Sequence, residues 1–214
     1  MLLYAVADIH GKKENLLKIR RNIEQYRPDI LIIAGDITNY FFPKETIEYV
    51  KNLSIPVLTV RGNSDFPIVE RLISETETVY SIHKEAYFEE GFHFIGLGGA
   101  MLLPFRTKVC FREANRFREI ESSLTDKSIL VMHPPPFGVL DRVMGRVHSG
   151  SREIYNIIAR RQPLLFICGH IHEDAGQSAI GKTIVVNCSI GKSGDGAMIQ
   201  LEENQMPKID FIQS

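Results

Sequence analysis

The chain has 214 residues, of which 44% are hydrophobic and 24% are charged, and its formal net charge is −1. This composition excludes an intrinsically disordered chain, because the hydrophobic fraction is high and the net charge is small. It also argues against nucleic-acid binding by bulk positive charge, and no apolar run approaches the ~20 residues that a membrane-spanning helix needs.

The cysteine count and the first residues predict where the protein works. Its three cysteines, Cys110, Cys168 and Cys188, are odd in number and irregular in spacing, which argues against a disulfide framework. Residues 1–7 lack the basic leader and cleavage site of a signal peptide and are typical of a core strand. We therefore expect a cytoplasmic protein that folds as a single domain over residues 1–214.

Alternating apolar and amphipathic segments predict an α/β fold. Short runs rich in Val, Ile and Leu predict strands at 2–7, 29–34, 57–60, 128–132 and 164–168. Because these runs are almost continuously apolar, the strands should be buried on both faces. Amphipathic segments between them predict helices at 12–27, 44–53, 65–74, 111–124 and 151–161. This alternation indicates a sheet of parallel strands.

Two regions break the alternation and predict antiparallel pairing. Residues 86–98 predict a hairpin with its turn near Glu90 and Gly91. Further strands are expected near 177–180, 182–189, 195–201 and 207–212, joined by turns that contain Gly or Asn. We therefore expect two mixed sheets packed face to face with helices outside, which is a four-layer α-β-β-α sandwich.

Side chains able to bind metal follow each of the five predicted apolar strands. They are two aspartates, one asparagine and four histidines: Asp8, His10, Asp36, Asn63, His133, His170 and His172. Because the carboxyl ends of strands in open α/β sheets line one rim, these side chains are expected to meet. One D-x-H or H-x-H pair arises often by chance, but suitable residues after all five strands do not.

The ligand types predict both the metals and the reaction. Mixed imidazole and carboxylate ligands favour Mn, Fe, Zn or Ni over Mg and Ca, and manganese is expected first. Seven ligands exceed the needs of one tetrahedral zinc ion and suit two adjacent ions that share a carboxylate. Two ions ~3.5–4 Å apart clamp both oxygens of an in-line phosphoryl displacement. We therefore predict metal-assisted hydrolysis of a phosphoester.

The motifs D-x-H, G-D, G-N-x-D, a lone His after a strand and G-H-x-H follow one another over residues 8–172. In this order they resemble the calcineurin-like metallophosphoesterases, most closely the small prokaryotic branch related to cyclic-nucleotide phosphodiesterases. The resemblance implies a four-layer α-β-β-α sandwich and a metal-bridging hydroxide as nucleophile. It implies one ion held by Asp8, His10 and His172. It implies a second ion held by Asn63, His133 and His170, with Asp36 as the bridge.

The third motif departs from the family pattern at Ser64. The family often has a His there, which protonates the leaving oxygen or stabilises charge in the transition state. A serine hydroxyl is not an acid near pH 7, so good leaving groups should be favoured or another residue should supply the proton. Our candidate is His148, in the loop before the last helix, and the alternative is that His148 caps that helix.

Two neighbours of the third motif have less direct roles. Arg61 is expected either to contact the phosphate or to pair with a surface carboxylate. Asp65 is expected to cap the following helix and to support a ligand without binding metal itself.

Together these features predict a phosphodiesterase that acts on a small phosphoester, with nucleotides as one class, and whose catalytic residues are Asp36, Asn63 and His148. A nuclease of the same superfamily is an alternative, but the near-neutral charge counts against it. A non-catalytic scaffold is another, but the complete ligand set counts against that. The expected partner is the small substrate, with neither nucleic acid nor membrane. Exposure of Phe41, Phe42 or Phe105 would mark a homodimer surface.

Overall fold

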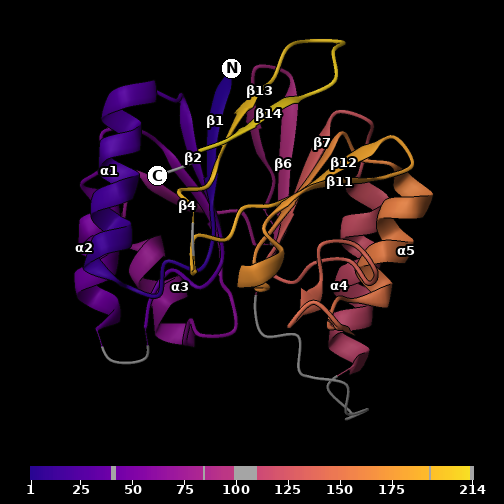
Figure 1. Cartoon of the computed structure of the whole chain (residues 1–214), viewed down its shortest axis with the longest axis horizontal. Coiled ribbons are helices and arrows are strands. Elements are labelled where there is room, and N and C mark those ends of the chain that lie inside the picture. Colours follow the sequence, from indigo (N-terminus) through magenta and orange to yellow (C-terminus); the bar gives the residue numbers. More distant parts are fainter. Residues whose placement is uncertain (40–41, 84, 99–109, 193, 213–214) are drawn as a thin grey trace.

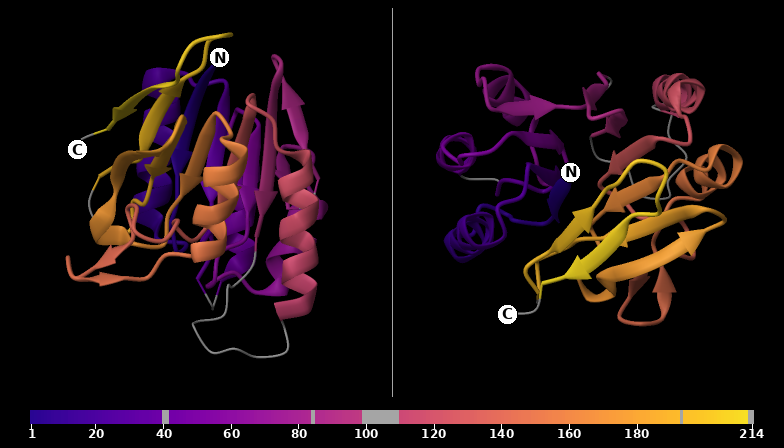
Figure 2. Two further views of the ribbon diagram at one scale, coloured as in Figure 1. Left: turned by 90° about the vertical axis from the view of Figure 1, so that its right-hand side faces the viewer. Right: turned by 90° about the horizontal axis from the view of Figure 1, so that it is seen from above.

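The computed structural model describes residues 1–39, 42–83, 85–98, 110–192 and 194–212. These residues form two six-stranded sheets packed face to face, with helices against both outer faces, as Figures 1 and 2 show. The helices are α1 (Lys13–Tyr26), α2 (Pro43–Lys51), α3 (Pro67–Ser74), α4 (Cys110–Ser123), α5 (Arg152–Arg161) and the short 3-10 helix η1 (His172–Asp174). The predicted four-layer α-β-β-α sandwich is confirmed.

The first sheet has four parallel strands, and two further strands are added at one edge by antiparallel pairing. Its strands are β1 (Leu2–Val6), β2 (Ile30–Ala34), β3 (Val57–Val60), β4 (Val79–Ser81), β13 (Ala197–Gln200) and β14 (Lys208–Phe211). Their order is β14-β13-β1-β2-β3-β4, and β13 is antiparallel to both of its neighbours. Helices α1, α2 and α3 cover the outer face of this sheet (Figure 1).

The second sheet has four parallel inner strands between two antiparallel edge strands. Its strands are β5 (Tyr87–Glu89), β6 (Phe92–Leu97), β7 (Ser128–Met132), β10 (Leu165–Cys168), β11 (Gly176–Ile180) and β12 (Thr183–Asn187). Their order is β11-β12-β10-β7-β6-β5, and α4 and α5 cover the outer face (Figure 1). A separate two-stranded hairpin of β8 (Arg142–Val143) and β9 (Val147–His148) precedes α5.

Apolar side chains fill all three spaces between the four layers. Leu3 and Ala5 of β1 point between the sheets, whereas Tyr4 and Val6 point toward the helices that cover the first sheet. All four are fully buried. A strand that is covered on both faces has no face exposed to solvent. This explains why the inner strands are nearly continuous apolar runs in the sequence.

The expected antiparallel pairing in the C-terminal part is confirmed, but one of its strands also pairs in parallel, which was not expected. Strand β12 pairs in parallel with β10 and antiparallel with β11. The reason is burial: β12 is almost fully buried and takes an inner position, whereas Gln177, Ser178 and Ala179 of β11 are exposed at the sheet edge. The 86–98 hairpin is confirmed, while β4 and the β8–β9 hairpin were not expected.

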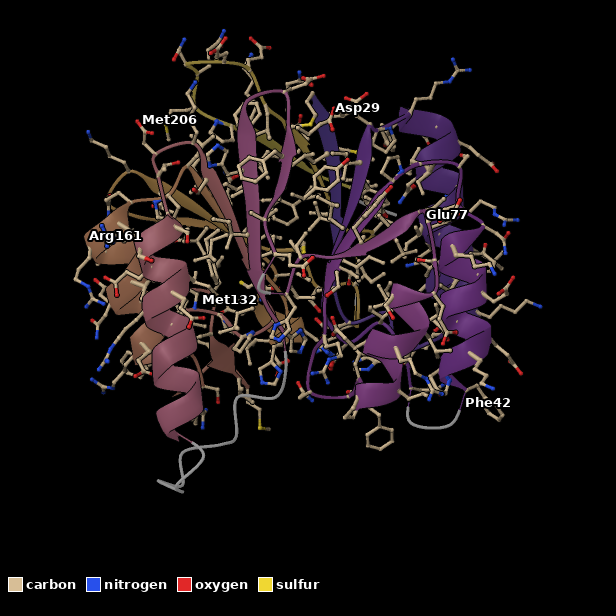
Figure 3. All side chains as sticks on the ribbon, turned by 180° about the vertical axis from the view of Figure 1, so that it is seen from behind. Asp29, Phe42, Glu77, Met132, Arg161 and Met206 are labelled. Atoms are coloured by element: carbon tan, nitrogen blue, oxygen red, sulfur yellow. The ribbon has the colours of Figure 1, made fainter. Side chains whose placement is uncertain are left out.

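The parallel strands of both sheets end at the same end of the molecule. Asp29, just before β2, and Met132, the last residue of β7, lie toward opposite ends of the sheets in Figure 3. The two sheets are joined near the Met132 end, where Ala7 donates to the Cys188 carbonyl at 3.1 Å and accepts from the Ile190 amide at 3.0 Å. The described part of the chain contains no helix long and apolar enough to cross a membrane.

The space between the sheets should contribute heavily to stability. Phe94 in β6 is fully buried there, so Phe94→Ala is expected to lower the free energy of unfolding by about 3–5 kcal/mol. Phe88 in the neighbouring strand β5 is 62% exposed, and Phe88→Ala should cost less than about 1 kcal/mol. Urea unfolding followed by circular dichroism measures both values, and similar losses in the two variants would contradict this packing.

Candidate metal centre

The loops that follow five parallel strands bring the predicted ligands together. Nitrogen and oxygen atoms crowd the space below the strand ends in Figure 3, between the two halves of the molecule. Strands β1, β2 and β3 of the first sheet and β7 and β10 of the second lead into this region. The predicted ligands in these loops are Asp8, His10, Asp36, Asn63, His133, His170 and His172.

One group of ligand atoms comes from Asp8, His10 and His172, and these atoms all lie within 4.8 Å of one another. His172 Nε2 is 3.2 Å from Asp8 Oδ1, and His10 Nε2 is 3.9 Å from the same oxygen. Asp8 is fully buried, whereas both histidines are partly exposed. The group therefore opens to solvent on its histidine side.

A second group surrounds His133 Nε2. That nitrogen lies 3.0 Å from Asn63 Oδ1, 3.3 Å from His170 Nδ1 and 3.4 Å from Asp36 Oδ2. Atoms that bind one ion at 2.0–2.2 Å lie about 3–3.5 Å from one another, so these separations fit a shared cation. Asp8 belongs to this group as well, because its ligand atom lies within 4.8 Å of those of Asp36 and His133.

An unpaired carboxylate oxygen lies between the two groups, where a metal ion would serve as its partner. Asp8 Oδ1 is buried and has no hydrogen-bond partner among the described residues, whereas Asp8 Oδ2 accepts from the His170 amide at 2.9 Å. A buried carboxylate oxygen without a partner is costly. Oδ1 lies 3.9 Å from His133 Nε2 and close to His172, between nitrogens that bind transition metals. The residues present therefore fit divalent cations.

The charges of the cluster shift the pKa values of its members in opposite directions. Burial would raise the pKa of Asp36, but hydrogen bonds with His133 and Ser64 and the charge of His133 outweigh it and hold that pKa well below its ordinary value. The pKa of Asp8 is lowered in the same way by His172 and His133. Burial would lower the pKa of His133, but Asp36 and Asp8 raise it to about 9. The cluster thus favours positive charge at its centre.

The orientation of His133 is set by its other ring nitrogen. Nδ1 lies 2.8 Å from the carbonyl oxygen of Ala34, the last residue of β2. Because a carbonyl can only accept, Nδ1 carries a hydrogen in both charge states of the ring, and Nε2 is the nitrogen that can bind a cation once its own proton is displaced. The first sheet therefore fixes a candidate ligand that follows a strand of the second.

Glycines in the second and third motifs make room for these ligands. A Cβ atom on Gly35, whose φ is +92°, would lie 2.7 Å from His133 Nδ1. A Cβ on Gly62 would collide with the carboxylate of Asp36. Glycine is needed at both positions because a neighbouring ligand occupies the space of a side chain.

Four of the ligand residues themselves have left-handed backbone conformations. Asp8, His10, Asp36 and His170 have φ values of 62°, 51°, 52° and 71°. Such conformations are strained for residues other than glycine and are concentrated at functional sites. Backbone hydrogen bonds hold the first two loops together: the Asp8 amide donates to Gly35 at 3.1 Å, and the His10 amide donates to Asp36 at 2.9 Å.

Asp65 supports the cluster without capping a helix. Helix α3 begins at Pro67 and Asp65 does not cap it, so that part of the expectation is wrong. Its carboxylate accepts from the amides of Ile37 at 3.1 Å, Thr38 at 2.8 Å and Gly62 at 2.9 Å. Asp65 therefore ties the Asp36 loop to the Asn63 loop, which is the supporting role that the sequence predicted.

Ser64 and Arg61 have contacts that limit their roles. Ser64 is buried, and it donates to Asp36 through its amide at 2.7 Å and its hydroxyl at 2.9 Å. It therefore holds the carboxylate of Asp36, a role that the sequence did not indicate. Arg61 Nε donates to Glu70 Oε2 at 2.9 Å, so of its two expected roles the structure shows pairing with a carboxylate.

His148 lies outside the ligand cluster, on β9. Its Nδ1 is 2.6 Å from Oδ1 of Asp141, a residue that no sequence motif indicated. The alternative role for His148 as a helix cap is wrong, because Ser151 caps α5 by accepting from the Ile154 amide at 3.3 Å. Asp141 and His148 are seven residues apart, at the base of a hairpin whose two-residue strands are too short for a periodic pattern to mark them as partners.

Comparison with known proteins extends over most of the chain. It is 32% identical to protein MJ1162 of Methanocaldococcus jannaschii, over 88% of both chains. It is 30% identical to human metallophosphoesterase domain-containing protein 1, over 86% of this chain and 64% of the human protein. A solved dimetal phosphatase from Danio rerio shares the fold with a TM-score of 0.71 and 13% identity, over 100% of this chain and 96% of that one.

A family match agrees with these relatives. The sequence model of the calcineurin-like phosphoesterases matches residues 1–174, a stretch that includes every ligand described above. This chain belongs to the calcineurin-like phosphoesterase family.

Proposed function

We propose that this chain is a phosphodiesterase that uses two metal ions to hydrolyse a small phosphoester. Membership of the family implies hydrolysis of phosphoesters. The observation that supports two ions is the overlap of two ligand groups that share Asp8. Asp36 Oδ2 also lies within reach of both groups, at 3.9 Å from His10 Nε2 and 3.4 Å from His133 Nε2.

We assign the seven ligands to two ions that Asp36 connects. The first ion takes Asp8, His10 and His172, and the second takes Asn63, His133 and His170. Mixed nitrogen and oxygen ligands favour manganese first and iron, zinc or nickel as alternatives. When bound, such ions supply a hydroxide nucleophile near pH 7 and offset the charge of the phosphoryl oxygens.

The protein's own groups hold this arrangement and leave one requirement open. Ser64 fixes both oxygens of Asp36, and Ala34 fixes the ring of His133. Because the Ser64 hydroxyl already donates its hydrogen to Asp36, Ser64 does not protonate a leaving group. We therefore propose His148 as the proton donor, beside Asp36 and Asn63 as the catalytic residues within the cluster.

The other expectations about organisation and partners are kept as part of this proposal. They are a single domain over residues 1–214, a cytoplasmic location and a small substrate such as a nucleotide. Phe42 is 59% exposed, as a homodimer surface would need, whereas Phe41 and Phe105 lie outside the described residues. The nuclease and scaffold alternatives are distinguished by the assay below.

Hydrolysis should depend on added metal and on Asp36. We expect metal-stripped protein to hydrolyse bis(p-nitrophenyl) phosphate only after Mn²⁺ is added, and to prefer it to p-nitrophenyl phosphate. Asp36→Asn should lower kcat/KM at least about 100-fold, because loss of a bridging charge removes several kcal/mol of transition-state stabilisation. Asp210→Asn, at an exposed carboxylate on β14, is the matched control and should have no effect.

Two results would overturn this proposal. Folded protein that shows no turnover with Mn²⁺, Ni²⁺ or Zn²⁺ would support the scaffold alternative. Metal-dependent cleavage of an oligonucleotide far faster than of the small diester would support the nuclease alternative.

Metal binding should strengthen as the pH rises toward 9. The pKa of His133 in the folded protein, about 9, exceeds the ordinary value of 6.5, and a cation must displace that proton. The proton on His133 stabilises the metal-free fold fully below pH 6.5, and this contribution is lost as the pH rises through 9. The increase in Tm on adding Mn²⁺ should therefore be larger at pH 9 than at pH 6.5.

Titration calorimetry in two buffers of different ionisation enthalpy measures the protons released on Mn²⁺ binding. We expect Mn²⁺ binding to release protons at pH 7.5, and to release fewer of them in His133→Gln. An affinity that is constant between pH 6.5 and 9 would contradict the charge assigned to His133.

A further inference from the structure

A buried carboxylate lies at the base of the β8–β9 hairpin. Asp141 is fully buried, and its Oδ2 accepts from the amides of Gly138 and Gly150, both at 2.9 Å. Its Oδ1 lies 2.6 Å from His148 Nδ1. Burial would raise the pKa of Asp141, but the hydrogen bonds from His148, Gly138 and Gly150 outweigh it and hold that pKa below its ordinary value. Asp141 is thus an ionised carboxylate with three donors.

One side of this loop is attached to the segment that follows His133. The Ser151 amide donates to the Pro135 carbonyl, and the Phe137 amide donates to the Ser151 carbonyl, both at 2.9 Å. Pro135 is two residues beyond His133, so the loop that carries Asp141 and His148 starts and ends beside a ligand of the cluster.

The hairpin itself is attached to the segment that follows His172. The Arg142 amide donates to Asp174 Oδ2 at 2.8 Å, and the Met144 amide donates to Glu173 Oε1 at 3.2 Å. His148 is the cross-strand partner of Arg142. The hairpin and η1 lie side by side in Figure 2. His148 is therefore placed by loops that hold ligands of both groups.

Asp141 determines which nitrogen of His148 can exchange a proton. A carboxylate can only accept, so Nδ1 carries a hydrogen in both charge states and Nε2 is the atom that gains or loses one. The centroids of the Phe137 and His148 rings are 5.5 Å apart. The guanidinium carbon of Arg152 lies 4.2 Å from the centroid of the Phe137 ring. The His148 side chain is still 36% exposed, so Nε2 belongs to a ring that is oriented but accessible.

We infer that Asp141 is a positioning residue that holds His148 so that its Nε2 gives a proton to the leaving group, an inference that rests on the function proposed above. As hydroxide adds to phosphorus, its oxygen forms the new P–O bond and its hydrogen stays on the phosphate product. The P–O bond to the leaving group breaks and the leaving oxygen keeps the electron pair. That oxygen takes the Nε2 proton of the His148 imidazolium. The neutral imidazole then regains a proton from solvent.

The Asp141→Asn variant separates this role from support of the loop. The amides of Gly138 and Gly150 require an acceptor, so the Asn oxygen takes the place of Oδ2 and its NH₂ group faces His148 Nδ1. Nδ1 must then accept, which disfavours the imidazolium and removes the proton donor while the shape is kept. His148→Gln removes the donor directly, and Asp210→Asn is the control.

A series of aryl methyl phosphates, from p-nitrophenyl to unsubstituted phenyl, gives the readout with Mn²⁺-loaded full-length protein. A proton donor matters most for the poorest leaving group and contributes about 10²–10⁴-fold there. In Asp141→Asn and His148→Gln we expect kcat/KM to fall at least about 100-fold for the phenyl ester and less than about 10-fold for the p-nitrophenyl ester. The double variant should match the single variants, because both remove one function.

Each other outcome rejects the inference. An equal loss of kcat/KM for all esters in both variants would show that Asp141 and His148 have a structural role only. The Tm of each variant measures the loss of stability that accompanies such a role. A steep dependence on the leaving group already in the wild type would show that no donor operates. If the dependence of kcat/KM on the leaving group becomes steeper in His148→Gln but not in Asp141→Asn, Asp141 does not position His148. No hydrolysis of any ester by the wild type would reject the proposed function as well.

Discussion

Asp8 and Asp36 bring two negative charges to a place where the packed sheets exclude water. Two carboxylates that share a buried site repel each other, and each loses its hydration, so the fold must supply positive charge or hydrogen bonds nearby. Much of the surrounding structure does so. Ser64 donates twice to Asp36, the His170 amide donates to Asp8, and His133 stands between them with a raised pKa. These contacts explain why loops from both sheets converge here.

Backbone strain and backbone support are balanced in the same loops. Left-handed residues bring the Asp8, Asp36 and His170 side chains inward from the strand ends. The free-energy cost of such conformations is of order 1–3 kcal/mol each, and they persist only where neighbours fix them. Here the neighbours that fix them are backbone hydrogen bonds between the first two loops. The Asp65 carboxylate adds three hydrogen bonds that it accepts from backbone amides. A site of this kind is formed by the fold before any ligand arrives.

The sequence predicted the inner strands, and the convergence of the polar side chains that follow them, for one physical reason. Strands buried on both faces are continuous apolar runs, and a polar residue that follows such a run directly has to lie at the sheet rim. His133 and His170 were predicted in this way.

The same reasoning fails where the signal depends on spatial neighbours. The direction of β12 follows from which strand occupies the edge, and the bond from Ser64 to Asp36 follows from loop conformation. Asp141 was missed because two-residue strands carry no periodicity.

The origin of the ligands in both sheets has a consequence for how the molecule assembles. Each group combines residues that follow β1 or β2 in one sheet with a histidine that follows β7 or β10 in the other. Asp8 and His170, which touch in the fold, are 162 positions apart in the chain, and closing so long a loop is entropically unfavourable in an unfolded chain. A chain with only one sheet formed has no complete group. In the two-metal enzyme proposed above, uptake of a cation would therefore be a late event in folding, and a bound ion would slow the separation of the two sheets.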